Sequence, residues 1–308
     1  MQKITPCLWF DMNCEEAINF YVSVFPNSSI KQMQKYPEGM TEGPMQGMAG
    51  RILTGIFELD GLTFQALDGG PYFKVTPAIS FMVNFDPSKN PHAAADLDAL
   101  WAKLSEGGLV RMPKQEYPFS KMFGWIQDRF GVNWQLILTD PDGEPRPNII
   151  PALLFTKDVS GKAEEAGQFY TSLFTNSRIG MVAKYPPGMP GGVDGGVMFE
   201  DIMLDGQWFA LMDGGPEHDF KFNEAVSLSV ETADQEETDF FFKSMSAVPE
   251  SEQCGWLKDK YGVSWQIAPK RMGELLSSSD TEKAKKAMSA MLKMKKINIA
   301  ELEVAYNA

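Results

Sequence analysis

The sequence FGWIQDRFGVNWQ at residues 123–135 returns as CGWLKDKYGVSWQ at residues 254–266. Other pairs keep the same order along the chain: FYVSVFPNSSI at 20–30 with FYTSLFTNSRI at 169–179, KYPEGM at 35–40 with KYPPGM at 184–189, and the LDG and DGGP motifs of 59–71 with those of 204–216. Ordered pairs at a drifting spacing indicate a duplication followed by insertions and deletions in loops.

The repeat predicts the domain organisation. We expect a first copy over residues 1–140 and a second over 149–270, each of ordinary domain size. Between them, PDGEPRPN at 141–148 is rich in proline and polar residues, which is typical of a linker. Residues 271–308 form an extension. There Asp280 is suited to cap a helix from about Thr281 to Met294, and a short second helix follows.

Hydrophobic spacing predicts the same order of elements twice within each copy. In the first copy, a strand precedes a helix that begins after Asn13 as N-cap, and strands follow at about 28–35, 51–60 and 62–67. The order then restarts with a strand at 78–85, a helix ended by Gly107 and Gly108, and a hairpin around Gly131. Each copy therefore consists of two βαβββ units. We expect an α+β fold with helices on one face of a strongly curved sheet.

Composition excludes several classes of partner. The formal charge is 28 basic minus 41 acidic residues, or −13, which disfavours nucleic acid as a partner. No stretch approaches the roughly 18 consecutive apolar residues of a membrane helix, and the N-terminus has no long apolar segment. Three cysteines without metal-binding spacing fit a reducing compartment. We therefore expect a cytoplasmic protein without a membrane partner.

The motifs FYxxxF and WxxDxFGVxWQ, met in order in both copies, resemble those of the vicinal-oxygen-chelate (glyoxalase/bleomycin-resistance) superfamily. The resemblance is to its PhnB-like branch, also labelled 3-demethylubiquinone 3-methyltransferase-like, and covers roughly residues 3–139 and 149–268. It implies tandem glyoxalase-like domains, each of two βαβββ units forming a cupped mixed sheet with helices outside. Methyl transfer finds no support, because a GxGxxG loop between a strand and a helix is absent.

Metal-dependent members of that superfamily hold a divalent ion with four inward-facing side chains, usually His and Glu. The matching positions here carry other residues: Pro6, Gln65, Ala78 and Gln135 in the first copy, and Pro151, Ala210, Ala225 and Gln266 in the second. Proline and alanine side chains offer no metal ligand, and amide oxygens do not replace the missing imidazoles and carboxylates. We therefore expect neither a metal nor another cofactor.

Strand alternation extends the inward-facing set to further residues. These are Leu8, Phe10, Thr63, Leu67, Ser80, Met82, Asn133 and Ile137, with Leu153, Phe155, Trp208, Met212, Ser227, Ser229, Ser264 and Ala268. The set describes an apolar cup with a few neutral polar groups, which is typical of a small-molecule site. Trp134 and Trp265 fall on the other face, where they are expected to pack under helices.

The candidate ligand-binding residues are Gln65, Asp68, Trp125, Gln135, Trp208, Asp213 and Gln266. Several have an alternative structural role: Asp68 and Asp213 stand in DGGP turns, where aspartate commonly binds its own backbone, and a glutamine can instead satisfy a buried backbone group. The loops at 37–50 and 186–196, rich in glycine, are either lids or plain loops. We expect the first cup, with Gln65, to be the roomier and more polar one. No catalytic residue is assigned.

The resulting hypothesis is a PhnB-like protein that binds a small organic molecule without a tightly held metal. Three alternatives stay open: a divergent lyase, isomerase or dioxygenase, an antibiotic-sequestering protein, or a structural role if side chains fill both cups. Because an interface between like domains is self-complementary, the copies are expected to pair within the chain. The assembly would then be a monomer or a homodimer.

Overall fold

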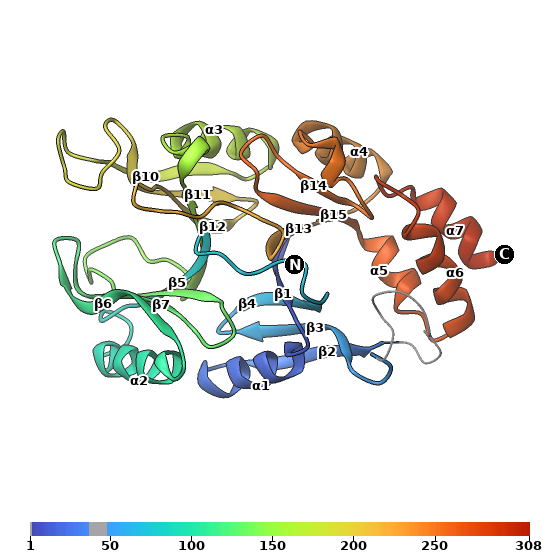
Figure 1. The fold of residues 1–308 in the computed structure, drawn as a ribbon, viewed down its shortest axis with the longest axis horizontal. Helices are drawn as coiled ribbons and strands as arrows, with labels where there is room; N and C mark the ends of the chain where they lie inside the picture. Colours follow the sequence, from blue (N-terminus) through green and yellow to red (C-terminus); the bar gives the residue numbers. More distant parts are fainter. Residues whose placement is uncertain (1, 37–47) are drawn as a thin grey trace. The chain divides into compact units, whose positions relative to one another are not determined.

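The computed structural model describes residues 2–36 and 48–308 (Figure 1). The loop at 37–50 therefore lies mostly outside the described residues. The first copy contains β1 (Ile4–Phe10), α1 (Cys14–Val24), β2 (Ser29–Lys35), β3 (Ile52–Leu59), β4 (Leu62–Asp68), β5 (Ile79–Phe85), α2 (Ala93–Ser105), β6 (Leu109–Tyr117), β7 (Ser120–Gln127) and β8 (Asn133–Leu138). The predicted elements are confirmed within a few residues, and β6 is an additional strand.

The second copy repeats this order with a shorter last part. It contains β9 (Ile149–Phe155), a short 3-10 turn (Lys157–Val159), α3 (Ala163–Leu173), β10 (Arg178–Lys184), β11 (Val197–Leu204), β12 (Gln207–Asp213), β13 (Val226–Thr232), α4 (Gln235–Met245), a second 3-10 turn (Pro249–Ser251), β14 (Trp256–Lys258) and β15 (Ser264–Pro269). The extension forms α5 (Lys270–Leu276), α6 (Thr281–Met291) and α7 (Ile299–Asn307).

Contacts divide the chain into two compact units, which are described separately. One comprises Cys7–Val226, and the other comprises Met1–Pro6 with Ser227–Ala308. The larger unit thus holds the whole first copy from Cys7 onward together with the first half of the second copy. The boundaries of the copies themselves remain a prediction from the repeat.

The larger unit contains an eight-stranded mixed sheet in the order β10-β11-β12-β9-β5-β8-β7-β6. The α+β class with mixed sheets is confirmed. The composition of this sheet differs from the expectation that each copy closes its own sheet, because β5–β8 of the first copy join β9–β12 of the second. The two halves meet where β5 pairs antiparallel with β9, with Ile79 opposite Leu153 and Met82 opposite Ile150.

One face of the eight-stranded sheet is concave. Strands β7 and β12 are four positions apart, so a flat sheet would separate them by about 19 Å. Yet Trp125 of β7 and Met212 of β12 belong to the same apolar cluster, together with Leu154 of β9. The strands therefore curve around this face, which we call the cup.

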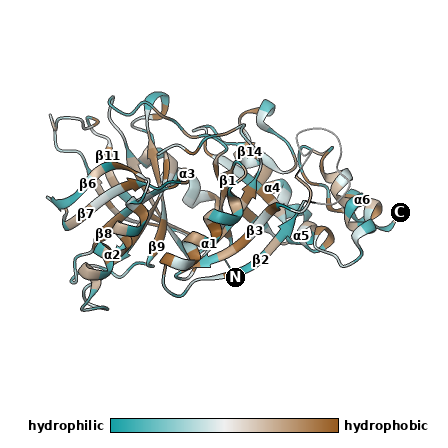
Figure 2. Ribbon diagram, turned by 60° about the horizontal axis from the view of Figure 1, so that its bottom comes forward, coloured by the Kyte–Doolittle hydropathy of each residue, from teal (hydrophilic) through white to brown (hydrophobic). Residues whose placement is uncertain are grey.

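Helices cover the opposite face of the sheet. Helix α2 packs on β7 and β8, and α3 packs on β11 and β12 (Figure 1). Trp134 is fully buried there and contacts Tyr21, Phe25 and Phe81 through its ring. Strand β9, buried along its whole length, is coloured mostly hydrophobic in Figure 2. The prediction that Trp134 packs under helices is confirmed.

The remaining strands of the larger unit run in the order β1-β4-β3-β2, with α1 packed on β3. Helix α1 begins as predicted, but Asn13 makes no side-chain capping hydrogen bond. Instead Asp68, at the end of β4, accepts a hydrogen bond from Met12 N at 2.6 Å. A carboxylate from a neighbouring strand end therefore anchors this helix start, a contact that local sequence does not reveal.

The smaller unit contains β14, β15 and β13 in that order, with α4 packed on β14 and β15. Asp280 caps α6 as predicted by accepting a hydrogen bond from Lys283 N at 3.2 Å. The helix ends at Met291, before the predicted Met294, and Leu292 is 46% exposed. Within this unit the extension is tied to the loop before β14 by the hydrogen bond from Gly255 N to Lys295 O at 2.7 Å. Among the described residues, no helix is long and apolar enough to cross a membrane.

Candidate ligand-binding site

The repeated hairpin is organised around one aspartate. Asp128 Oδ2 accepts hydrogen bonds from Trp134 Nε1 and from Tyr21 Oη, each at 2.8 Å. Its Oδ1 accepts the backbone N–H groups of Phe130 and Val132. In the second copy, Asp259 Oδ2 accepts Trp265 Nε1 at the same distance. Sequence reasoning assigned the tryptophans to the core but missed the aspartate that orients them.

The repeated glutamine faces the cup. Gln135 of β8 lies opposite Met82 of β5, is 4% exposed, and donates a hydrogen bond from Nε2 to Ser80 Oγ at 2.9 Å. In the smaller unit, Gln266 donates to Ser227 Oγ at the same distance. The structural alternative expected a backbone partner for each amide. Each Nε2 is instead paired with a serine hydroxyl on the neighbouring strand.

In β1 and β9, the side chains that face the concave side of the sheet are not the ones expected from the sequence. Pro151 lies opposite Phe81 on the helix-covered face, whereas Ala152 lies opposite Ala210 and faces the cup. Likewise Cys7, not Pro6, pairs with Gln65. A shift of one residue turns every side chain of a strand to the other face. The expected inward positions of Pro6, Leu8, Phe10, Pro151, Leu153 and Phe155 are therefore wrong.

The side chains of the two DGGP aspartates accept hydrogen bonds from backbone N–H groups at the start of a helix or strand. Asp213 is fully buried and accepts Ala163 N at 3.1 Å and Val197 N at 2.8 Å. Burial raises the pKa of Asp213 and of Asp68, and hydrogen bonds from backbone N–H groups oppose the rise. Their geometry fits the structural role that sequence reasoning weighed against ligand binding.

The repeated KYP motif holds the same turns. Tyr185 Oη donates to Asp213 O at 2.8 Å, and Tyr36 Oη donates to Asp68 O. The backbone and side chain of each aspartate are therefore both engaged.

Trp125 lies in the cup, on β7 directly opposite Gln135. It is 7% exposed and packs with Phe123 and Leu154. Its Nε1 is buried and has no hydrogen-bond partner among the described residues. Asn133 Oδ1, on the same face of the adjacent strand, is likewise buried and unpartnered within the described part of the chain. The cup therefore contains one donor and one acceptor that these residues leave unsatisfied.

Trp208 occupies the other end of the cup, in a cluster with Met82, Ile150, Ala152 and Ala210. The guanidinium of Arg146 stacks on its ring, with Cζ 3.8 Å from the ring centroid. Arg146 Nε also bonds Asp201 Oδ2 at 2.8 Å, and only 14% and 5% of these two side chains is exposed. A nearly buried ion pair therefore closes the Trp208 end.

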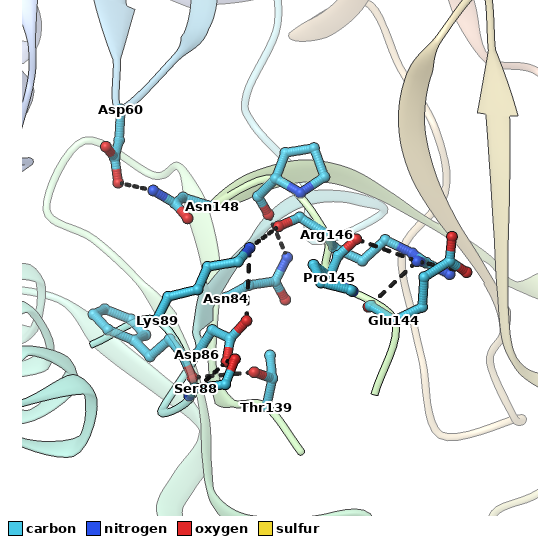
Figure 3. Close-up of polar contacts among 12 residues, drawn as sticks. Asp60, Asn84, Asp86, Ser88, Lys89, Thr139, Glu144, Pro145, Arg146 and Asn148 are labelled. Atoms are coloured by element: carbon cyan, nitrogen blue, oxygen red, sulfur yellow. Dashed lines mark hydrogen bonds and ion pairs between the residues drawn. The ribbon is translucent and has the colours of Figure 1, made fainter. Parts of the chain in front are cut away.

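The linker supplies that arginine. Glu144 pairs with both Arg146 and Arg178. Figure 3 shows Glu144 beside Arg146 and shows Asn84, which holds the backbone around Asn148. The first copy has Ile56 and Thr63 where the second has Asp201 and Trp208. The ion pair is thus specific to the second copy. No sequence signal revealed it, because the linker was interpreted only as a spacer.

Gln65 is half-buried on β4, opposite Cys7 and Ile56. Strand β4 belongs to the other set of strands, so Gln65 does not share the eight-stranded cup with Gln135. The expectation of a first cup that combines these two glutamines is wrong, because the sheet exchanges halves between the copies. Gln135 instead shares its cup with Ala210 and Trp208, which were expected in the second.

A groove of about 670 Å³ lies elsewhere, between the end of α1, the end of β5 and helix α2. Its polar rim is largely engaged with itself. Asn148 donates to Asp60 and Ser88 donates to Asp86 (Figure 3). Asn90 donates to Asp96. Because the groove pairs its own polar groups whereas the cup leaves Trp125 Nε1 unsatisfied, we place the candidate site in the cup.

Among residues 2–36 and 48–308, no three His, Cys, Asp or Glu side chains lie close enough together to hold a metal ion. Of the positions that the resemblance matches to metal ligands, Ala78, Gln135 and Ala210 share the cup face, and none of them supplies imidazole or carboxylate. We predict that elemental analysis after dialysis finds no stoichiometric Zn, Ni, Mn or Fe. About one retained metal ion per chain would contradict this.

A family model described as 3-demethylubiquinone-9 3-methyltransferase matches residues 2–137 and, a second time, residues 147–268. The chain belongs to the 3-demethylubiquinone-9 3-methyltransferase family. The two matches confirm the PhnB-like resemblance and the tandem duplication. No curated protein matches the chain.

Solved structures similar to this chain include two proteins that match less than half of it and one that matches most of it. The PhnB protein of Bacillus cereus is 38% identical over 45% of this chain and 100% of its own, with a TM-score of 0.39. Protein PA1353 of Pseudomonas aeruginosa is 25% identical over 45% of this chain and 98% of its own, with a TM-score of 0.38. A glyoxalase I mutant of Zea mays is 12% identical over 85% of this chain and 92% of its own, with a TM-score of 0.47.

Proposed function

We propose that the protein binds a small, neutral organic molecule in the cup of the eight-stranded sheet, without a tightly held metal. The observation that carries the proposal is the set of polar groups on an otherwise apolar face. Gln135 and Ser80 form a buried pair at its centre, and Trp125 Nε1 and Asn133 Oδ1 lie beside them without a partner among the described residues. An apolar concave surface with a few convergent polar groups is typical of ligand sites.

Charge on the cup favours a neutral ligand. At the Trp208 end, Arg146 is already neutralised by Asp201 and by Glu144. The other polar groups named on this face are amides, a hydroxyl and an indole, which carry no charge. Transfer of an ionised ligand into such surroundings would be costly because nothing offsets its lost hydration.

The proposal is limited to binding. Methyl transfer, the activity in the family's name, is not part of it, because no GxGxxG loop joins a strand to a helix in this sequence. Asp68 and Asp213, the acidic candidates for acid–base chemistry, hold backbone N–H groups instead.

The test is Gln135→Leu, which keeps the approximate volume of the side chain but removes its hydrogen bonds. Against ligands found by thermal-shift screening of neutral organic molecules, the variant should bind more weakly by about 1–3 kcal/mol, or roughly 5- to 150-fold. Isothermal titration calorimetry measures the difference.

Gln266→Leu is the matched control. It changes the same position of the repeat, but in β15 and not in the eight-stranded sheet, and should leave affinity for the cup ligand unchanged. Equal affinity of the Gln135→Leu variant and the unmodified protein would remove Gln135 from the site.

A further inference from the structure

The loop that follows β12 covers Trp125. His218 lies with its ring centroid 6.4 Å from that of Trp125, and Phe220 lies 5.2 Å from His218. Phe220 also packs against the cluster of Phe123, Trp125 and Leu154. Residues 214–222, which we call the covering loop, therefore place two aromatic side chains over this end of the cup.

The contacts that hold the covering loop are buried at its ends and exposed at its middle. Thr156 Oγ1 donates to Phe220 O, and Ser160 Oγ donates to Gly214 O at 2.9 Å. Lys157 pairs with Asp219, whose side chain is 92% exposed. An exposed ion pair contributes little to stability. The outer part of the loop, around Asp219, is therefore held more weakly than its two ends, where Gly214 N donates to Phe155 O at 2.7 Å and Phe222 packs on Phe155.

The covered indole differs from others in the larger unit. Trp134 Nε1 donates to Asp128 at 2.8 Å, and Trp9 Nε1 donates to Gly70 O at 2.7 Å. Trp125 Nε1 is as inaccessible as a core atom but has no acceptor among the described residues. Leaving a buried donor unsatisfied costs free energy on folding. An acceptor brought by a ligand would recover this free energy.

We propose that Trp125 Nε1 is the recognition donor for a ligand that enters beneath the covering loop, and that the ligand is a neutral aromatic molecule carrying a carbonyl oxygen. This inference rests on the proposed function and specifies its ligand class. Aromatic character suits the surrounding rings of Phe123, His218 and Phe220. A carbonyl oxygen accepts the indole N–H without adding charge to the cup.

Two probes of nearly equal shape distinguish the contribution of the carbonyl acceptor from that of the aromatic ring. Acetophenone carries a C=O group, and α-methylstyrene carries a C=CH2 group in its place. In a ¹H–¹⁵N spectrum of the tryptophan indoles, the Trp125 signal is identified by its loss in Trp125→Phe. Acetophenone should move this signal downfield and bind about tenfold more tightly than α-methylstyrene. Trp125→Phe should bind both probes equally.

The outcomes distinguish this inference from the proposed function. If both probes bind equally and shift the Gln135 side-chain amide but not the Trp125 indole, the inference is overturned and the proposed function stands. If neither probe binds, the inference is overturned, whereas the proposed function fails only if the Gln135→Leu variant keeps full affinity for the ligands found by screening. The comparison in the unmodified protein decides the result even if Trp125→Phe does not fold.

The role of the covering loop has its own readout. Thr156→Val removes the hydroxyl that binds Phe220 O while keeping the side-chain shape. Hydrogen exchange of the Trp125 indole should accelerate about tenfold in this variant, while that of Trp134 stays unchanged. Unchanged exchange at Trp125 would show that another element covers it and would overturn entry beneath the loop.

Discussion

Replacing Asp128 by alanine is expected to destabilise the protein by about 4 kcal/mol, because breaking a buried charged network leaves its partners unsatisfied. Four donors lose their acceptor: Tyr21 Oη, Trp134 Nε1 and the N–H groups of Phe130 and Val132. Burial raises the pKa of Asp128 to about 6, against the opposing hydrogen bonds. At pH 8 the group is therefore an ionised acceptor.

The measurement is urea unfolding at pH 8, followed by tryptophan fluorescence. Asp259→Ala tests the same position in the smaller unit, where Trp265 Nε1 and the N–H groups of Tyr261 and Val263 lose their acceptor. It should be destabilising to a similar degree. A loss below about 1 kcal/mol in both variants, as is usual for surface substitutions, would show that the repeated aspartate does not hold the hairpin.

The second large effect is a pH dependence centred on Glu200. This residue of β11 is fully buried on the helix-covered face, and neither carboxylate oxygen has a hydrogen-bond partner among the described residues. It lies beneath Gly167 of α3, where a Cβ added to the glycine would stand 2.6 Å from Glu200 Oε1. In the first copy the large and small residues are exchanged: the helix carries Ile18 and the strand carries Gly55.

Burial raises the pKa of Glu200 from 4.5 to about 7; Glu164, Asp213 and Asp201 add to the rise and Lys184 opposes it. Below pH 4.5 the group is protonated in both states. Between pH 4.5 and 7 the folded state keeps the proton that the unfolded state releases, so stability falls as pH rises. Above pH 7 the loss is complete and amounts to about 3 kcal/mol.

Glu200→Gln removes the titrating carboxylate and, with it, this dependence of stability on pH. Its free energy of unfolding should match that of the unmodified protein near pH 4.5 and exceed it by about 3 kcal/mol at pH 8. Urea unfolding at several pH values measures the difference. Glu116→Gln, which changes an exposed carboxylate on β6, is the control and should leave the profile unchanged. Parallel profiles for Glu200→Gln and the unmodified protein would contradict the assignment.

The sequence predicted the elements well because their signals are local. Helical spacing located α1 and α2, and Asp280 marked the start of α6. The repeated motifs FY, KYP and WxxD predicted the duplication, and the structure gives them a physical cause. In the first copy the Tyr21 and Trp134 side chains share Asp128, and Tyr36 holds the backbone of Asp68.

The arrangement of the cup was harder to predict because it depends on contacts distant in sequence. Alternation within β8 placed Gln135 on the cup face correctly. In β9 the predicted alternation was wrong by one residue, because the continuous apolar run IIPALLF does not indicate which side chains face the cup. Pairing of β5 with β9 exchanged halves between the copies. The linker residue Arg146 then reached Asp201 and Trp208, a contact that no local pattern indicates.

The most direct test of the account is whether residues from both copies line one ligand site. Met82 of β5 and Met212 of β12 belong to different copies, and both pack within the cup. With ¹³C-labelled methionine methyl groups, acetophenone should shift the signals of both residues with the same apparent Kd, and Gln135→Leu should weaken both together. Shifts confined to methionines outside the cup, with Met82 and Met212 unmoved at saturation, would contradict it.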